Sequence, residues 1–108
     1  MAKEELLHGT LDLLILKTLQ GGPRHGYGVA RFLEERTDDT LLVEEGSLYP
    51  ALYRLERRGL VEASWGLSEL QRRAKFYKLT REGRQALTTE TRAWLEFAAA
   101  VTKVLVPA

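Results

Sequence analysis

The sequence contains no cysteine, only three prolines and almost no excess of charge of either sign, with a formal net charge of +1 over 108 residues. Without cysteine the chain cannot form disulfides, thiolate metal sites or cysteine nucleophiles. Its apolar runs, such as Leu13 to Leu16, are much shorter than the roughly 20 residues that a membrane-spanning helix needs. The N-terminus also lacks the pattern of a signal peptide, so we expect a cytoplasmic protein without a membrane partner.

Charge is unevenly distributed along the chain, although the total is near zero. Residues 1–46 carry five basic and nine acidic side chains, whereas residues 47–84 carry nine basic and four acidic ones. Residues 85–108 are balanced, with two of each. A basic middle segment is either an ordinary solvated surface or the electrostatic footprint of a nucleic-acid-binding site, and the spacing of residues has to decide between them.

Helical spacing recurs in the first half of the chain. Largely apolar positions at 11, 14, 15, 18 and 19 predict a helix that Thr10 caps and that Gly21-Gly22-Pro23 ends. Apolar residues at 29, 32 and 33 predict a second, short helix that begins after residues 26–28 and fades near Thr37. Leu41 to Val43 form a brief apolar run that we expect to be a minor strand at the edge of a small sheet.

A third helix is predicted from Ser47 to Arg58. Pro50 has no backbone N–H, which suits the first turn of a helix, and this places the start near residue 46 or 47, with Ser47 as the cap. Leucines at positions 48, 52 and 55 form an apolar stripe, and Gly59 follows as a C-terminal stop. The stripe predicts which side of this helix faces the core.

Alternating apolar and polar residues after this helix predict two strands, 61–65 and 74–79, joined by a polar loop as a β-hairpin. Thr80 follows as the cap of a long final helix from Arg81 toward Leu105. Positions spaced alternately by four and three along that helix are typical of a seam between two helices: Leu87, Thr91, Trp94, Ala98, Val101 and Leu105. A helix of about 24 residues is longer than so small a core can cover, so we expect the seam to pair two copies of the chain.

The predicted order of helices and hairpin is that of a winged helix-turn-helix, a mostly α fold with a small β-hairpin (α+β). We expect residues 1–80 to form the winged helix-turn-helix DNA-binding domain and residues 81–108 the C-terminal dimerisation helix, the two making one compact unit. Such domains insert the second helix of the helix-turn-helix into the major groove and place the hairpin, or wing, against the neighbouring backbone. Double-stranded DNA is therefore the expected partner.

Candidate DNA contacts follow from this arrangement. If the leucine stripe of the third helix faces the core, its opposite surface carries hydroxyl, aromatic and guanidinium groups: Ser47, Tyr49, Pro50, Tyr53, Arg54 and Arg57. Arginine can contact the O6 and N7 atoms of guanine together, and we expect Arg54, followed by Tyr53, to read bases. Phosphate contacts are expected from the wing and the second helix: Arg72, Arg73, Lys75, Tyr27 and Arg31.

Five motifs resemble those of the PadR-like transcriptional regulators, especially the short forms with one C-terminal helix. They span about residues 6–84, and their combination and order are more specific than any one of them. The motifs are Gly9-Thr10-Leu11-Asp12-Leu13-Leu14, His25-Gly26-Tyr27-Gly28, Gly46-Ser47-Leu48-Tyr49-Pro50-Ala51-Leu52, Arg54-Leu55-Glu56 and Arg72-Arg73-Ala74-Lys75-Phe76-Tyr77-Lys78-Leu79-Thr80.

The resemblance implies a homodimeric repressor that binds a palindromic operator and is, in some members of the family, released by a phenolic or hydrophobic effector. It also implies dimerisation through the first and last helices, which adds Leu11 and Leu14 to the seam. Trp94, in the middle of the seam, either packs in the protein interior or lines an effector pocket, because a flat aromatic ring can stack on a planar ligand.

Other classes of function have less support. The two histidines, His8 and His25, come without cysteines or clustered carboxylates, so we expect no metal and no cofactor. Ser47 has no histidine nearby in the sequence, and we expect no enzymatic activity. The alternatives left open are a winged-helix module that binds another protein, which the acidic first third favours, and a small-molecule sensor with little DNA binding.

Overall fold

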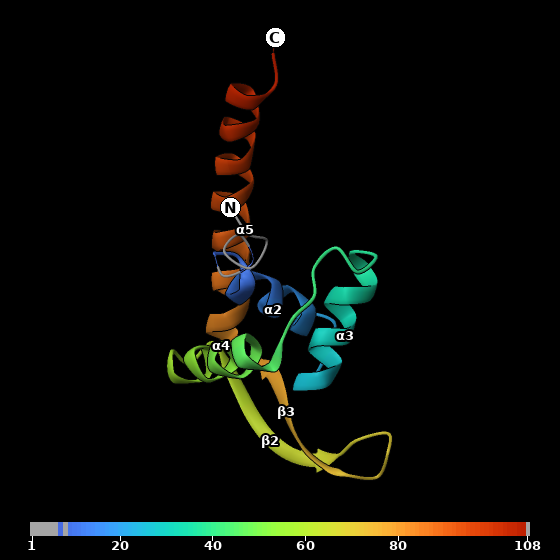
Figure 1. Cartoon of the computed structure of the whole chain (residues 1–108). Coiled ribbons are helices and arrows are strands. Elements are labelled where there is room, and N and C mark those ends of the chain that lie inside the picture. The colour runs from blue at the N-terminus through green and yellow to red at the C-terminus, as the bar shows by residue number, and fades with distance from the viewer. Residues whose placement is uncertain (1–6, 8, 108) are drawn as a thin grey trace.

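A computed structural model describes residues 7 and 9–107 and contains a helical body with one antiparallel hairpin (Figure 1). Along the chain the elements are α2 (Leu11–Leu19), β1 (Arg24–His25), α3 (Gly26–Arg36), α4 (Glu45–Arg57), β2 (Val61–Leu67), β3 (Arg73–Leu79) and α5 (Arg81–Leu105). The expected class, mostly α with a small sheet, is confirmed. Within the described residues, no helix has the length and apolar character needed to cross a membrane.

One hydrophobic core lies where α2, α3 and α4 meet. The predicted stripe of α4 is buried there, with Leu48 at 1% exposure and Leu52 and Leu55 at 0%. Ile15 and Leu16 of α2 and Val29 of α3 are equally buried, as helical periodicity predicts for the inner faces of three packed helices. Since the inner side of α4 is fixed by this packing, its opposite side faces solvent.

The sheet has three strands in the order β1-β3-β2, all antiparallel. The hairpin of β2 and β3 was expected, and each strand extends closer to the connecting loop than predicted. The expected minor strand at Leu41 to Val43 is wrong, because the third strand is Arg24–His25, which pairs with Tyr77 and Phe76 of β3. The apolar character of that run has another cause, since Val43 inserts into the core from the connection between α3 and α4.

The start of α4 also differs from the prediction. Glu44, in an extended conformation, is the N-cap residue, and its carbonyl accepts hydrogen bonds from the N–H groups of Ser47 (3.0 Å) and Leu48 (2.9 Å). Ser47 therefore lies inside the first turn and not at the cap, and Pro50 lies beyond that turn. A proline there removes one intrahelical hydrogen bond, which the helix tolerates because its apolar face is held by the core.

Helix α5 begins where predicted. The Thr80 hydroxyl accepts a hydrogen bond from the N–H of Gly83 (3.0 Å), which satisfies one of the free donors of the first turn. Gly83 is required at this point because a Cβ on it would overlap the Leu60 carbonyl. The first turns of α5 pack beside α2, and the rest of the helix extends away from the hairpin and beyond the other elements (Figure 1).

Candidate nucleic-acid interface

The solvent-facing side of α4 carries a ridge that we define by Pro50, Tyr53 and Arg57. All three are exposed, because they lie opposite the buried leucines at a spacing of three and four residues. The Arg57 guanidinium lies over the Tyr53 ring, 5.7 Å from its centroid, and its Nη1 lies 3.5 Å from the Tyr53 hydroxyl. The structure thus brings together an aromatic ring, a hydroxyl and a cation on one convex surface.

Tyr49 and Ser47 flank this ridge on opposite sides of the helix. Tyr49 turns toward α3, where its ring covers the backbone of Gly26, so that a Cβ on that glycine would lie 2.7 Å from the Tyr49 Cε1 atom. The tyrosine is still 44% exposed, so one edge of the ring remains accessible. Ser47 is half-buried on the other flank.

Arg54, expected to be the main base-reading residue, does not lie on the ridge. It is one residue after Tyr53, a rotation of about 100° around the helix axis, and faces α2. There its Nη2 donates a hydrogen bond to the Asp12 Oδ1 atom (2.9 Å), and the Arg58 Nη1 lies 3.9 Å from Oδ2 of the same carboxylate. Half of the Arg54 side chain remains exposed, at 53%. The prediction had no means of anticipating Asp12, which is 42 residues away in the sequence.

Helix α3 places Tyr27 and Arg31 on its outer side. The helix is capped by His25, whose Nδ1 accepts a hydrogen bond from the N–H of Gly28 (3.1 Å), so this histidine has a structural role. Tyr27 is exposed, whereas Arg31 pairs with Glu35 one turn later (2.9 Å). That pair could have been found from its i, i+4 spacing. Because both side chains are mostly exposed, the pairing is weak and leaves Arg31 free to exchange partners.

The hairpin carries the three expected cations in different surroundings. Arg72 and Arg73 are exposed near its tip, and the Arg73 guanidinium lies 4.7 Å from the centroid of the Trp65 ring on the opposite strand. Lys75 lies nearer the base, where its Nζ is 3.3 Å from the Glu56 Oε1 atom of α4. Two arginines are therefore available at the tip, whereas Lys75 links the hairpin to α4.

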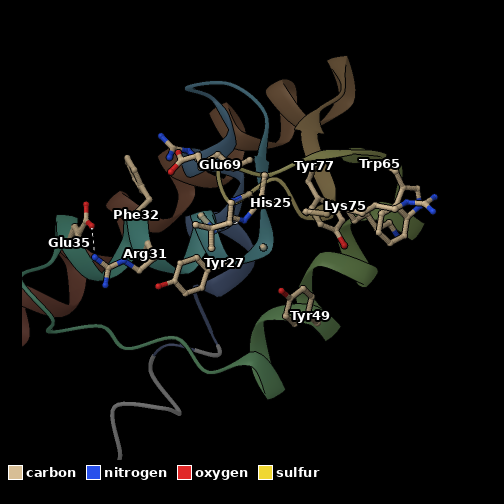
Figure 2. A pocket seen from close by; sticks show the side chains of 17 residues that line it. His25, Tyr27, Arg31, Phe32, Glu35, Tyr49, Trp65, Glu69, Lys75 and Tyr77 are labelled. Carbon is tan, nitrogen blue, oxygen red and sulfur yellow. Dashed lines mark hydrogen bonds and ion pairs between the residues drawn. The ribbon is translucent and has the colours of Figure 1, made fainter.

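An open groove of about 940 Å³ runs between the start of α3, the start of α4 and the hairpin (Figure 2). Five expected contact residues line it, namely Tyr27, Arg31, Tyr49, Arg73 and Lys75. Tyr77 lies at its inner wall, and burial raises the pKa of that hydroxyl, with Lys75 acting in the opposite direction. Tyr53, Arg54, Arg57 and Arg72 do not line the groove. Tyr53 and Arg57 lie on the convex ridge, Arg54 faces α2, and Arg72 lies near the hairpin tip.

The seam predicted on α5 is partly corrected by the structure. Leu87, together with Leu11 of α2, belongs to the core of the same chain, with 5% and 2% exposure, so neither has appreciable surface left for a partner. Leu14, Thr91 and Ala98 are partly buried, whereas Trp94, Val101 and Leu105 are exposed. Phe97 and Val104 are further exposed apolar residues on the same side of α5, and they lie outside the strict heptad spacing.

Trp94 lines a shallow pocket of about 560 Å³ where α2, α4 and α5 meet. The other lining residues are Gly9, Asp12, Leu13, Arg54, Glu90, Ala93 and Phe97. Two aromatic rings and several charged groups thus surround one depression, which contains the Asp12–Arg54 pair. Among the described residues no group of three or more histidine, cysteine or carboxylate side chains is arranged to hold a metal ion, and His8 lies outside those residues.

A transcriptional regulator from Clostridium thermocellum superposes with a TM-score of 0.83 at 27% identity, covering 92% of this chain and 96% of that one. A PadR-like transcriptional regulator from Bacillus cereus gives a TM-score of 0.81 at 27% identity, covering 96% and 99%. An uncharacterized protein from Lysinibacillus sphaericus is 28% identical over 96 residues, which are 89% of this chain and 88% of the relative.

Residues 15–89, from the middle of α2 to the third turn of α5, match the family described as "Transcriptional regulator PadR-like family". This range includes α3, α4 and the hairpin, and therefore both surfaces on which the expected contact residues lie. The resemblance noted from the five motifs is confirmed. The chain belongs to the PadR-like family of winged-helix, DNA-binding transcriptional regulators.

Proposed function

We propose that the protein is a sequence-specific repressor that binds a palindromic operator as a homodimer. The observation that carries the proposal is the ridge of α4, on which Tyr53 and Arg57 contact one another and face solvent. The major groove of DNA admits an α-helix, and arginine is the side chain best suited to a guanine there. We therefore assign base reading to this ridge.

Within this proposal Arg57, and not Arg54, is the first candidate for a base contact. Arg54 would have to leave Asp12 to reach a base edge, and the carboxylate would then lose its closer partner. Arg57 does not have to break an ion pair to reach a base, because its contact with Tyr53 leaves both side chains facing solvent. Tyr53 and Tyr49 supply hydroxyls beside it, while Ser47 and Pro50 shape the helix surface that approaches the groove.

The concave groove and the tip of the hairpin are assigned to the DNA backbone. The groove holds Tyr27, Arg31 and Lys75, and Arg73 extends it toward the tip. Phosphate contacts of this kind add affinity and fix the register of the protein without reading sequence. Arg72, at the exposed tip, is assigned to the neighbouring phosphates or a narrow minor groove.

Dimerisation is assigned to the outer half of α5. Trp94, Phe97, Val101, Val104 and Leu105 form one apolar side of this half, and all five are exposed in the single chain. Burying such side chains is worth roughly 25 cal/mol for each Å² of apolar surface removed from water. A symmetric partner on this side, with Leu14, Thr91 and Ala98 at the margin, would present two α4 ridges to the two halves of a palindrome.

A titration against the DNA upstream of the protein's own gene tests the proposal. We expect tight binding to that duplex, weaker binding to a random duplex of the same length, and a protected region with two equal halves. Equal affinity for both duplexes at physiological salt would refute sequence-specific binding. A protected region without internal symmetry would refute the palindromic operator alone.

Release by a small effector is a second candidate property, supported by the pocket around Trp94. Its lining combines Trp94 and Phe97 with Arg54, which lies on the same helix as the proposed reading ridge. A planar phenolic or hydrophobic ligand that stacks on the indole would change its fluorescence. If the fluorescence of a Trp65→Phe variant, in which Trp94 is the remaining tryptophan, stays constant across a panel of such compounds, the effector pocket is refuted.

A further inference from the structure

Three arginines lie at the end of α4, with Arg54 and Arg57 in its last turn and Arg58 at its C-cap, and they have different partners. Arg57 contacts Tyr53 on the ridge, whereas Arg54 and Arg58 both approach the carboxylate of Asp12 on α2. Among the described residues, Arg57 and the hairpin arginines Arg72 and Arg73 have no ion-pair partner. The cations of the proposed DNA-binding surface are therefore of two kinds, held by a carboxylate or unpaired.

The geometry around Asp12 suits a carboxylate that holds two guanidinium groups. Its two oxygens face different arginines, Oδ1 at 2.9 Å from Arg54 and Oδ2 at 3.9 Å from Arg58, and the side chain is only 27% exposed. Asp12 also lies in the first turn of α2, where the positive end of the helix dipole favours a negative charge. Glu90 of α5 lines the same depression, so the surroundings of Arg54 are acidic on two sides.

A similar arrangement occurs on the opposite flank of α4. Glu56 of α4 holds Lys75 of the hairpin, with 3.3 Å between Oε1 and Nζ. The ridge therefore has a carboxylate–cation pair on each side, and in each pair the carboxylate partly neutralises the charge of its cation. The pairs are partly exposed, and ion pairs of this kind contribute little to folding stability. Their effect on DNA binding is consequently separable from any effect on stability.

We infer that Asp12 is a positioning residue that holds Arg54 and Arg58 away from DNA phosphates and so restrains sequence-independent binding. The inference rests on the proposed DNA-binding function of α4. Contacts between cations and phosphates strengthen binding to every sequence, and each releases counterions. In the folded chain the two arginines lie against a carboxylate of their own chain. Binding then depends more on the ridge, where Arg57 and Tyr53 meet base edges, and discrimination between sequences improves.

Asp12→Asn tests the inference, because it removes the charge and keeps nearly the same shape. Binding of the full-length protein to a random duplex is measured by fluorescence anisotropy over a series of salt concentrations. We expect affinity to rise by about threefold or more at low salt, and the slope of log K against log salt to steepen by about 1 to 2, since each new phosphate contact contributes about 0.9. Asp12→Glu retains the charge and is expected to restore the wild-type slope.

Glu62→Gln is the matched control. Glu62 of β2 pairs with Lys78 of β3 at 3.1 Å near the base of the hairpin, and its substitution changes the net charge by the same amount. If Asp12→Asn and Glu62→Gln steepen the slope equally, a general charge effect explains the result and the inference is overturned. An unchanged slope in a folded Asp12→Asn protein overturns it as well.

Arg54→Gln provides an independent measurement that does not depend on the folding of the Asp12 variant. Because Arg54 is held by Asp12, this substitution is expected to leave the slope of log K against log salt for random DNA unchanged. A decrease of about 1 in that slope would show that Arg54 already contacts a phosphate in the wild-type protein, and this would overturn the inference. Equal binding of wild-type protein to operator and random DNA, with a steeper slope for Asp12→Asn, would refute only the proposed specificity. Absence of DNA binding by all variants at low salt would refute both.

Discussion

The ring of Tyr49 lies against the backbone of Gly26, so close that a Cβ on the glycine would be 2.7 Å from Cε1 and 2.8 Å from the hydroxyl oxygen. This contact joins the start of α3 to the first turns of α4. It fixes the direction of the tyrosine at the edge of the groove, and it explains why glycine precedes Tyr27 in the sequence. Tyr49 is thereby positioned by α3 and not only by its own helix.

We expect Gly26→Ala to displace the Tyr49 ring and to weaken binding to the operator by about 1 kcal/mol, or roughly fivefold. The fold should persist, because the ring can rotate outward and an alanine suits a helix. Gly21→Ala is the control, since a Cβ there meets its neighbours at an ordinary 3.7 Å. Operator affinity that is the same in both variants would contradict a role for the Tyr49 position.

Arg57→Ala and Arg73→Ala are expected to weaken binding in different ways. The first removes a side chain of the ridge and should cost about 1–3 kcal/mol at the operator while relaxing the preference for one base. The second removes a cation of the hairpin and should weaken operator and random DNA alike, with a salt slope reduced by about 1. Anisotropy titrations with a set of singly substituted operators measure both effects. If the two variants behave alike, the division between ridge and hairpin is wrong.

Val101→Glu is expected to dissociate the dimer without unfolding the chain. Val101 lies in the middle of the exposed apolar side of α5, and a buried carboxylate there would be costly in a dimer but harmless in the solvated single chain. Sedimentation equilibrium should report the mass of one chain, and operator affinity should fall because two linked half-site contacts become one. Ala99→Glu, on the opposite side of the helix, should leave the mass unchanged. A dimer that survives Val101→Glu would exclude this surface as the interface.

Gly83→Ala is expected to destabilise the protein by about 3 kcal/mol or more, because the new Cβ would overlap the Leu60 carbonyl, and backbone cannot move as a side chain can. Thr80→Ala, which removes the hydroxyl that caps the same helix, should cost only about 1 kcal/mol. Urea unfolding followed by circular dichroism gives both values. A cost for Gly83→Ala no larger than that for Thr80→Ala would show that α5 can shift on the hairpin.

Local patterns were sufficient to predict most of the elements. The leucine spacing of α4 predicted its buried face, and Thr80 predicted the start of α5, because periodicity and capping act between residues only a few positions apart. The alternation of β2 and β3 predicted the hairpin for the same reason. Motifs spread over the same segments were sufficient to identify the family.

Packing decided the features that depend on residues far apart in the sequence. The third strand consists of Arg24 and His25 and has no apolar pattern. It forms because this segment lies beside β3 and pairs with it. Leu87 fits a heptad seam by spacing, yet it is buried in its own core, since α5 crosses α2 at that point. Arg54 lies on the polar side of an isolated helix, but in the folded chain this position faces α2, where the guanidinium pairs with Asp12, 42 residues earlier.

The sequence alone therefore determined the order of the helices and the β2–β3 hairpin, the inner faces of α2, α3 and α4, and the family to which the protein belongs. Only the tertiary structure decided which of the exposed cations remain without an ion-pair partner. Pairs such as Arg54–Asp12 join two different helices, and local sequence patterns do not predict how helices are placed relative to one another. That distinction moves the expected base contact from Arg54 to Arg57. It also assigns a role to Asp12 that no spacing along α4 could have indicated.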